Sequence, residues 1–316
     1  MGRGLLVDSN LITVYGDWFI DRDYFVTKKD ILLDVISREY IGQNILVICF
    51  DGENTKFSGF EQFLIYLCDS IGIPYSKVTI RSHSLRVDPR FNHERLNLGV
   101  FLSAGSKIPT EFDRDVSNGK FVGTLIRRYN LTRLRILYEL DNAFPGDNFM
   151  TFHSEFSHVE FNLSKFRDQY TNELNWLQNK QFDFHLPVTV RDSDLWETAC
   201  AAYGDVWNKF KIELIAETDS LDDYWFTEKT AKCLATGKPF VLMSGQNSLK
   251  NLKKQGYQTF GEILDESYDN EATPYYRIKK IVQSLKTLYN NPARDILIQN
   301  MYQISEQNIK IYQGKN

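Results

Sequence analysis

A hydroxyl, a carboxylate and an ammonium group stand side by side in Thr227-Glu228-Lys229, at the predicted start of a helix. The apolar run 210–216 precedes them, and a second apolar run, 239–243, follows a Gly-Lys-Pro stop. Because such runs are typical of buried strands, the helix is expected to begin beside the carboxyl end of a parallel sheet. A helix start in that place binds phosphate through its backbone N–H groups. The carboxylate and the ammonium suit the ribose hydroxyls and the pyrophosphate of a nucleotide, so this run predicts a nucleotide site.

An ordinary helix start is the alternative interpretation, because a Thr N-cap followed by charged residues is common. Lys229 lies early in the predicted helix, where a positive charge is unfavourable with the helix dipole, and this favours a bound anion. Glu217 closes the run 210–216 and is predicted to bond a sugar or to position Lys229, with a solvated loop edge as the alternative. Tyr224 is a candidate to stack on a base or to bond a phosphate, or else to fill the core.

Three arginines, Arg127, Arg128 and Arg133, cluster where the predicted strand 120–126 meets a predicted helix that Asn130 caps. Departure of a nucleoside diphosphate develops negative charge on its β-phosphate, and a fixed guanidinium stabilises that charge with two hydrogen bonds. Arg128 is the first candidate for this role and Arg133 the second. A solvated basic helix start is the alternative.

The elements that must position these residues alternate between strand-like and helix-like patterns. The predicted strands are 44–50, 77–81, 97–102, 120–126, 148–153, 210–216 and 239–243, and residues 88–94 are predicted to form a loop. The predicted helices are 60–71, 131–140, 227–236, 247–255, 275–290 and 293–312, with a helical tendency at 163–177. This alternation predicts an α/β fold made of two Rossmann-like domains that face each other across a cleft.

We expect an N-terminal domain over residues 1–112, a nucleotide-binding domain over 113–292, and a final helix within 293–316 that braces the N-terminal domain. The chain has 316 residues, a formal net charge of −4 and an isoelectric point near 5.8, so no overall basic field attracts nucleic acid or anionic membrane. Its four cysteines are widely spaced, which indicates buried free thiols rather than a disulfide framework. No run of eighteen apolar residues occurs, so a soluble cytoplasmic protein without a membrane partner is expected.

Residues 224–239 resemble the donor-site motif of the family 10 α1,3-fucosyltransferases. That motif has a Glu before an acidic loop, then an aromatic residue, Thr-Glu-Lys, and a helix of small residues that ends before a Pro-initiated strand. Glu217, Tyr224, the run 227–229 and the run Ala235-Thr-Gly-Lys-Pro239 match these elements. The stretch 249–269 is similar to glycosyltransferase-like proteins of phages and large DNA viruses. The flanking residues differ from the family's, so the resemblance specifies a donor-binding scaffold rather than a particular sugar.

The resemblance implies a GT-B glycosyltransferase that moves a sugar from a nucleotide sugar to a hydroxyl acceptor by metal-independent inversion. It implies that Glu228 bonds both ribose hydroxyls, that Lys229 meets the pyrophosphate and that an arginine meets the leaving phosphate. Inverting transfer needs a general base for the acceptor hydroxyl. Asp51 and Glu53, which follow the apolar run 44–50, are the candidates, with Asp8 as a rival and an acidic helix-capping turn as the alternative. If the protein is viral, the host cytoplasm is the expected location.

The acceptor is expected to be a glycan, and a hydroxymethylated base in phage DNA is the alternative. DNA would need a basic, aromatic-lined groove, for which Arg81, Arg86, Arg90 and Arg95 with Phe91 are candidates. A non-catalytic nucleotide- or glycan-binding module is the alternative from another class. No cofactor and no metal are expected: two formal DxD matches, at 113–115 and 192–194, follow no apolar strand, and the histidines lack metal-site spacing.

Overall fold

The computed structural model describes ten stretches of the chain. They are residues 4–8, 11–16, 45–50, 60–82, 87–95, 118–126, 130–152, 167–182, 204–217 and 226–314. The chain divides into two compact units, Met1–Asn97 and Leu98–Asn316. The boundary predicted at 112 falls in the stretch 96–117, which lies outside the described residues.

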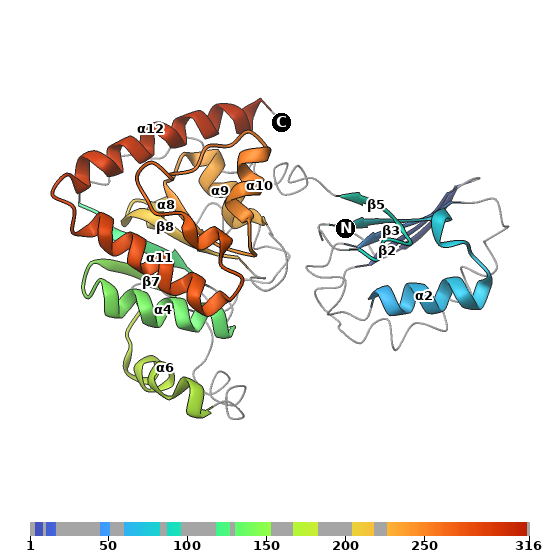
Figure 1. The fold of residues 1–316 in the computed structure, drawn as a ribbon, viewed down its shortest axis with the longest axis horizontal. Coiled ribbons are helices and arrows are strands. Elements are labelled where there is room, and N and C mark those ends of the chain that lie inside the picture. The colour runs from blue at the N-terminus through green and yellow to red at the C-terminus, as the bar shows by residue number, and fades with distance from the viewer. Residues whose placement is uncertain are drawn as a thin grey trace. The chain divides into compact units, whose positions relative to one another are not determined.

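Unit 1 is built on a five-stranded sheet in the order β1-β2-β3-β4-β5. The strands are β1 (Gly4–Asp8), β2 (Leu11–Gly16), β3 (Ile45–Phe50), β4 (Val78–Ser82) and β5 (Asn92–Arg95). Strands β2 to β5 pair in parallel, whereas β1 pairs antiparallel with β2. The helix α2 (Phe60–Ile71) and the 3₁₀ turn η1 (Tyr75–Lys77) connect β3 to β4. The predicted strand–helix–strand unit is therefore present (Figure 1).

One expectation for unit 1 is wrong. Residues 92–95 form the strand β5 in the stretch that was expected to be a loop, because main-chain pairing with β4 holds even these polar residues in a sheet. Asp8 was considered as a base at the carboxyl edge of the sheet. It pairs with Leu11, the first residue of β2, because β1 runs in the opposite direction. Asp8 therefore lies at the edge where the parallel strands begin. Its role as a base stays a prediction.

Unit 2 holds a four-stranded sheet, all parallel, in the order β7-β6-β8-β9. Its strands are β6 (Lys120–Leu125), β7 (Asn148–Thr151), β8 (Phe210–Ala216) and β9 (Phe240–Met243). From β6 the chain passes outward to β7, and from β8 it passes outward on the other side to β9. This is the doubly wound arrangement, and its strand order reverses between the neighbours β6 and β8.

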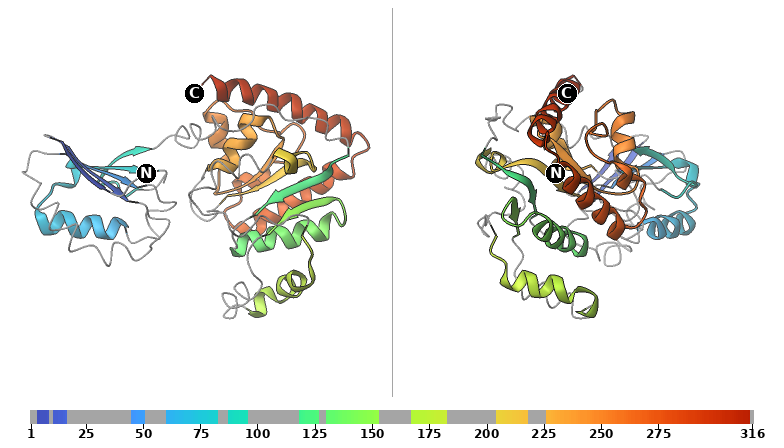
Figure 2. Two further views of the ribbon diagram at one scale, coloured as in Figure 1. Left: turned by 180° about the vertical axis from the view of Figure 1, so that it is seen from behind. Right: turned by 60° about the vertical axis from the view of Figure 1, so that its left-hand side comes forward.

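Helices cover both faces of this sheet (Figures 1 and 2). The helices of unit 2 are α4 (Leu131–Ala143), α6 (Arg167–Asn179), α8 (Gly204–Trp207), α9 (Glu228–Thr236), α10 (Ser248–Lys254), α11 (Pro274–Tyr289) and α12 (Arg294–Gln313), with a 3₁₀ turn η4 (Ser267–Asn270). Of these, α6 packs on α4 rather than on the sheet. Helices α4 and α11 pack together on one face, and α9 and α12 pack together on the other. Right-handed crossovers that leave β6 and β8 in opposite directions produce this division.

The core of unit 2 is aromatic on the face that α4 and α11 cover. Phe121 of β6, Phe144 after α4 and Tyr289 of α11 contact one another with ring centroids 5.0 to 5.3 Å apart. These rings join both helices to the sheet. Aromatic contacts of this kind stabilise beyond the apolar area that they bury.

Capping residues define the start of α4 and the end of α9 in unit 2. The Asn130 side chain accepts a hydrogen bond from the Arg133 amide, which confirms the predicted cap of α4. Gly237 ends α9 with φ 73° and donates its amide to the Cys233 carbonyl, which confirms the predicted stop before β9. A side chain at Gly237 would meet Ile309 of α12, so the same glycine also lets α12 lie against α9.

The final helix α12 packs onto unit 2. The Tyr302 hydroxyl donates to the Lys211 carbonyl of β8, and the Asn308 amide exchanges two hydrogen bonds with the Gln258 backbone. The further prediction that this helix braces the N-terminal domain concerns the arrangement of the two units, and it stays a prediction. The predicted α/β class is confirmed, with parallel strands in both sheets.

One buried cluster of ionisable groups lies in the core of unit 2, away from the carboxyl ends of the strands. Glu213 of β8 accepts a hydrogen bond from the Cys233 thiol at 3.3 Å, and burial raises its pKa to about 7. Lys238 donates to the carbonyls of Trp207 and Phe210, and burial lowers its pKa to about 7. Removing a charged group from water favours its neutral form, so both groups lose charge more easily here than in water.

Gly123 of β6 should tolerate no side chain. A Cβ built there would lie 2.3 Å from the Phe210 ring. We expect Gly123→Ala to lower the free energy of unfolding by about 1–3 kcal/mol, measured by urea denaturation. Phe210→Leu removes the obstructing ring, so the double variant should be more stable than the sum of the two single changes implies. Strict additivity would contradict the predicted clash.

Glu213→Gln should change the pH dependence of stability. The folded carboxyl ionises at about 7 against 4.5 for its ordinary value, so wild-type stability from this group is present at low pH and is lost as the pH rises through 7. The variant has no such loss. Its stability relative to wild type should grow between about pH 5 and about pH 8, by on the order of 3 kcal/mol. Chemical denaturation at each pH measures this.

The exposed Glu262 offers a matched control, since Glu262→Gln makes the same change at the surface. A flat difference between Glu213→Gln and wild type across this range would show that the buried carboxyl does not hold its proton.

Candidate functional site

The carboxyl edge of the unit 2 sheet is where a ligand is expected. Ligands of doubly wound sheets bind outside the carboxyl ends of the strands, at the point where the strand order reverses. Here that point lies between β6 and β8. The backbone register of these strands runs from Lys120–Phe210 to Gly123–Glu213. Beyond it, side chains bond the β8 carbonyls: the Thr124 hydroxyl donates to Leu214 and the Arg133 guanidinium to Ala216.

Glu217, the residue that follows β8, organises this edge. Its side chain is buried, with 2% of the residue exposed. One carboxylate oxygen accepts from the Thr227 amide at 2.9 Å and from the Thr230 hydroxyl at 2.6 Å, and the other accepts from the Thr227 hydroxyl at 2.6 Å. Three hydrogen bonds from two threonines therefore tie the end of β8 to the start of α9.

Lys229 lies in the first turn of α9, against the same cluster. Its ammonium donates to the Thr227 hydroxyl at 3.0 Å, and its nitrogen lies 3.7 Å from a Glu217 oxygen. Of the two roles predicted for Glu217, positioning Lys229 is the one that this geometry supports. The Glu217 charge also offsets the unfavourable interaction of Lys229 with the helix dipole. An external anion is therefore not required to explain a lysine at this position.

Thr227 is the N-cap of α9 and the centre of the cluster. Its hydroxyl accepts from the Lys229 amide at 3.3 Å while it donates to Glu217, so the helix begins with its cap held in place. Glu228 occupies the first position of the helix, so its backbone lies at the mouth of α9. The sequence motif is thus confirmed as a helix start at the carboxyl edge of the sheet.

Arg133 joins the other side of the edge. It lies in the first turn of α4, with 6% of the residue exposed, and its guanidinium donates to the Ala216 carbonyl at 3.2 Å. This bond links the helix after β6 to the last residue of β8. Because Ala216 directly precedes Glu217, this bond places the Arg133 guanidinium at the end of β8, next to the residue that organises the start of α9.

Several predicted site residues lie outside the described residues, and their roles stay predictions. They are Asp51 and Glu53 after β3, Arg127 and Arg128 after β6, and Tyr224 before α9.

A residue that sequence reasoning missed, Arg277 of α11, closes the edge beside β9. It is fully buried and donates to the carbonyls of Ser244 and Glu271. Burial lowers its pKa, while Asp269 and Glu271 act in the opposite direction. Because Ser244 directly follows β9, Arg277 brings the start of α11 to the carboxyl edge of the sheet. An arginine between apolar positions early in a helix was the available signal.

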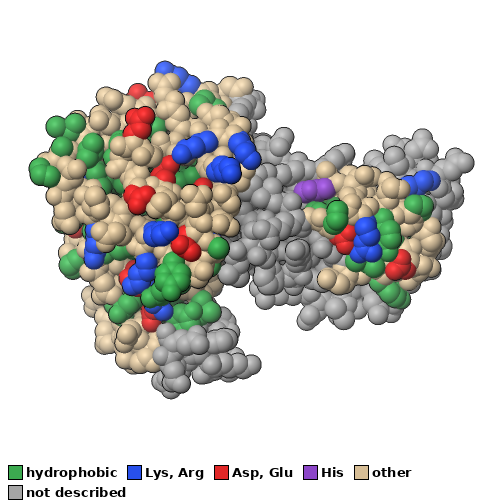
Figure 3. All heavy atoms as spheres, in the orientation of Figure 1, with side chains coloured by type: hydrophobic (Ala, Val, Ile, Leu, Met, Phe, Trp, Pro, Cys, Tyr) green, Lys and Arg blue, Asp and Glu red, His purple; other side chains and the backbone are tan. Residues whose placement is uncertain are grey.

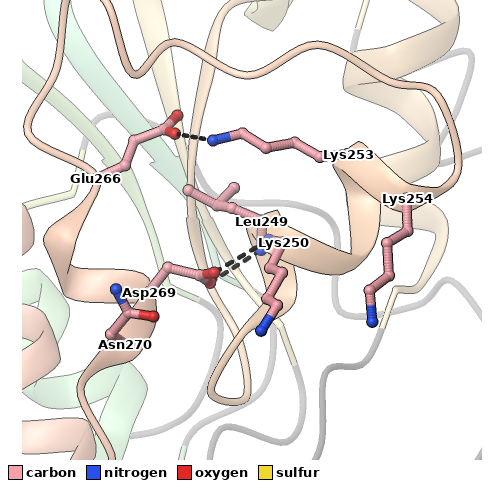
Figure 4. A pocket seen from close by; sticks show the side chains of 7 residues that line it. All are labelled: Leu249, Lys250, Lys253, Lys254, Glu266, Asp269 and Asn270. Atoms are coloured by element: carbon pink, nitrogen blue, oxygen red, sulfur yellow. Dashed lines mark hydrogen bonds and ion pairs between the residues drawn. The ribbon is translucent and has the colours of Figure 1, made fainter.

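A hollow of about 520 Å³ lies beside α10 (Figure 4). Lys250, Lys253 and Lys254 line it, and Figure 3 shows basic side chains gathered over this helix. The Asp269 carboxylate accepts hydrogen bonds from the Leu249 and Lys250 amides in the first turn of α10, at 2.9 and 3.1 Å. The Glu266 carboxylate pairs with the Lys253 ammonium at 3.0 Å. Carboxylates thus occupy two amides of α10 and the Lys253 ammonium. Because α10 also lies away from the point where the strand order reverses, the start of α9 is the stronger candidate.

Two of the five residues named for a DNA-binding patch in unit 1, Arg90 and Phe91, have described side chains. Phe91 is buried, with 5% exposed, and contacts Tyr75 edge-on instead of offering a surface for stacking. Arg90 pairs with Asp88 through two hydrogen bonds, at 2.9 and 2.7 Å, which holds the pKa of that carboxyl low, at about 2. Neither of these two side chains offers a free stacking face or an unpaired charge to nucleic acid. The side chains of Arg81, Arg86 and Arg95 lie outside the described residues, and the patch stays a prediction.

Among the residues that the structure describes, no group of three or more His, Cys, Asp or Glu side chains is placed to hold a metal ion. In the same part of the chain, no helix combines the length and the apolar character needed to cross a membrane. The two cysteines that the structure describes with side chains, Cys68 and Cys233, are buried free thiols, as expected.

No protein-family model matches this chain, and no curated protein matches it at a significant level. The geometry of the carboxyl edge and the sequence motif are therefore the grounds for a function.

Glu217→Gln should loosen the start of α9. The amide that replaces one carboxylate oxygen is a donor facing a donor, either the Thr227 amide or a threonine hydroxyl, so at least one buried group loses its partner. We expect the free energy of unfolding to fall by about 1–3 kcal/mol. Hydrogen exchange of the amides from Lys229 to Ala231 should accelerate more than exchange in α11.

The exposed Glu262→Gln is again the control, with unchanged exchange in α9. If Glu217→Gln accelerated exchange uniformly across unit 2, the carboxylate would not act on the start of this helix.

Proposed function

We propose that the chain is a nucleotide-sugar-dependent glycosyltransferase of the GT-B type. In this proposal the donor nucleotide binds at the carboxyl edge of the unit 2 sheet, and the acceptor binds chiefly on unit 1. The observation that supports it most directly is the position of Lys229. Thr227 and Glu217 hold its ammonium at the start of α9, beside the point where the strand order reverses.

The charges of the described edge suit a diphosphate. Lys229 and Arg133 each carry a positive charge, Glu217 carries one negative charge, and the start of α9 adds about half a positive charge. The balance is positive, so a phosphate group is attracted. The 3.7 Å separation of Lys229 from Glu217 is longer than a hydrogen bond. Glu217 therefore orients the ammonium by charge without taking one of its N–H groups.

The chemistry that we expect at this edge is transfer with inversion at the anomeric carbon. As the acceptor oxygen attacks that carbon, the bond to the β-phosphate breaks, and the negative charge moves onto the leaving nucleoside diphosphate. Lys229, with Arg128 as the predicted guanidinium, would stabilise this charge. A carboxylate of unit 1, Asp51 or Glu53 in this proposal, would accept the proton of the acceptor hydroxyl. Glu228 would hold the ribose through its two acceptor oxygens.

A glycan is the acceptor that we propose. The alternative, a hydroxymethylated base in DNA, is disfavoured by the burial of Phe91 and the pairing of Arg90 with Asp88. A non-catalytic binding module remains the contrasting proposal, and it predicts nucleotide binding without turnover.

Lys229→Met should weaken nucleotide binding by about 10- to 100-fold, since it removes a charge-assisted hydrogen bond to phosphate. The measurement is a thermal-shift panel with GDP, UDP, CDP and ADP and their sugars, followed by calorimetric titration of the nucleotide that stabilises. A nucleotide at 100 times its Kd should stabilise the wild-type protein by about 2.7 kcal/mol. Slow release of nucleoside diphosphate from the matching sugar would distinguish the enzyme from the binding module.

Lys211→Met is the matched control. Lys211 lies near the start of β8, at the opposite end of the strand from Glu217, where it pairs with Asp295. This variant removes the same charge from the other edge of the sheet and should bind the nucleotide as wild type does. Equal affinities of Lys229→Met and wild type, or no stabilisation by any nucleotide of the panel, would falsify the proposed donor site.

A further inference from the structure

An exposed pair of tyrosines begins α11. Tyr275 is 43% exposed and Tyr276 is 58% exposed, although large aromatic side chains are usually buried in a core or an interface. Their ring centroids lie 5.2 Å apart with the planes at 74°, so the two rings meet edge to face. Figure 3 shows hydrophobic and basic side chains side by side over α4 and α11. We call Tyr275 and Tyr276 the tyrosine platform.

The platform is fixed in place from below. Pro274 is the first residue of α11, and Arg277, in the same turn, is buried and bonded to the carbonyls of Ser244 and Glu271. The Arg135 guanidinium of α4 lies 5.2 Å from the centre of the Tyr275 ring, and the Lys279 ammonium lies 5.8 Å from it. Cation–π contacts hold a ring in one orientation. The Tyr275 ring is therefore held before any ligand arrives, and Tyr276 meets it edge to face. Order of this kind lowers the entropic cost of binding.

The charges around the platform cancel. Arg135 pairs with Glu173 at 2.5 Å and lies 3.9 Å from Glu139, and Lys279 pairs with Glu139 at 2.7 Å. Two cations thus face two carboxylates. Among the described side chains, a phosphate or a nucleic acid would find no net positive charge here, in contrast to the start of α9. A neutral ligand with an apolar face and many hydroxyl groups fits these surroundings best.

The platform lies at the same edge of the sheet as the candidate donor site. Arg277 joins the start of α11 to Ser244, which directly follows β9. Arg135 lies early in α4, which begins at the carboxyl end of β6, and Arg133 of the same turn bonds the end of β8. The helix α11, which carries the platform, and the helix α4, which contributes Arg135, therefore both start at the edge where Glu217 and Lys229 lie.

We propose that the tyrosine platform binds a neutral pyranose ring of a saccharide, which stacks on Tyr276. The C–H groups on one face of a pyranose carry a partial positive charge, and the face of an aromatic ring is negative. The exposed Lys279 ammonium lies beside the Tyr275 ring and can donate to sugar hydroxyls, and the Glu139 carboxylate with which it pairs can accept from them. As a subsite for the acceptor this inference rests on the proposed function, whereas saccharide binding itself does not.

The test is direct binding of neutral oligosaccharides to the full chain without nucleotide. Maltotetraose, cellotetraose, chitotetraose and a β-galactan tetrasaccharide are the probes, measured by saturation-transfer NMR and calorimetry. At least one should bind with a Kd of about 1 mM or tighter. Tyr276→Ala should weaken it about tenfold, whereas Tyr276→Phe and Tyr276→Trp should retain binding because the aromatic face remains.

Tyr66→Ala is the matched control, since Tyr66 of α2 is 45% exposed in unit 1, and this variant should bind as wild type does. Absence of binding by every probe, or an unchanged affinity in Tyr276→Ala, would overturn the proposal. So would tighter binding of a heparin tetrasaccharide or oligo-dT than of any neutral probe. A change of oligomeric state in Tyr276→Ala, measured by sedimentation, would identify the platform as a contact between two copies of the chain and would also overturn it.

The two proposals fail separately. Tyr276→Ala should keep the nucleotide affinity of the wild-type protein, and Lys229→Met should keep its saccharide affinity. Loss of nucleotide binding with intact saccharide binding would count against the donor site alone. If a sugar donor and a bound saccharide do react, Tyr276→Ala should raise the KM for the saccharide and leave the slow hydrolysis of the donor unchanged.

Discussion

The buried carboxylate of Glu217 is the interaction on which the candidate site depends. A buried carboxylate is costly unless it is hydrogen-bonded and paired, and here Thr227, Thr230 and Lys229 meet both requirements. In return the carboxylate fixes where α9 begins relative to the end of β8. The helix start therefore faces the carboxyl edge in one orientation, and the ammonium of Lys229 is placed with it. A phosphate would meet groups that are already ordered.

The strand order decides what else reaches that edge. The parallel strands β6 and β8 are followed by connections that lead to opposite sides of the sheet, to β7 and to β9. For this reason α4 and α9 start on opposite faces of the sheet but at one edge. The buried Arg277 brings the start of α11 to the same place. The described side chains then divide the edge into two regions, one with an excess of positive charge around Lys229 and one with balanced charges around Tyr275. The diphosphate of a nucleotide sugar is charged and suits the first region, whereas a neutral saccharide suits the second.

Local patterns predicted most of the elements. Helix 60–71 and strand 210–216 have the bounds that their apolar spacing indicated, and Asn130 and Gly237 end their elements as their residue types require. The local patterns did not predict which strands pair or in which direction a strand runs. Strand β5 is polar and is held by its neighbour, and Asp8 lies where the parallel strands begin because β1 is antiparallel. The local periodicity predicts neither fact, because it describes one segment at a time.

The sequence by itself determined the α/β alternation, the helix start at Thr227 and the kinds of group that gather there. Only the tertiary structure decided how those groups are used: Glu217 bonds threonines ten and thirteen residues further on, and Arg133 bonds a carbonyl 83 residues away. It also decided that Phe91 is buried while Tyr276 is exposed. The physical reason is that helix periodicity and capping act over a few residues. Burial and the pairing of buried charges, in contrast, depend on which distant segments pack together.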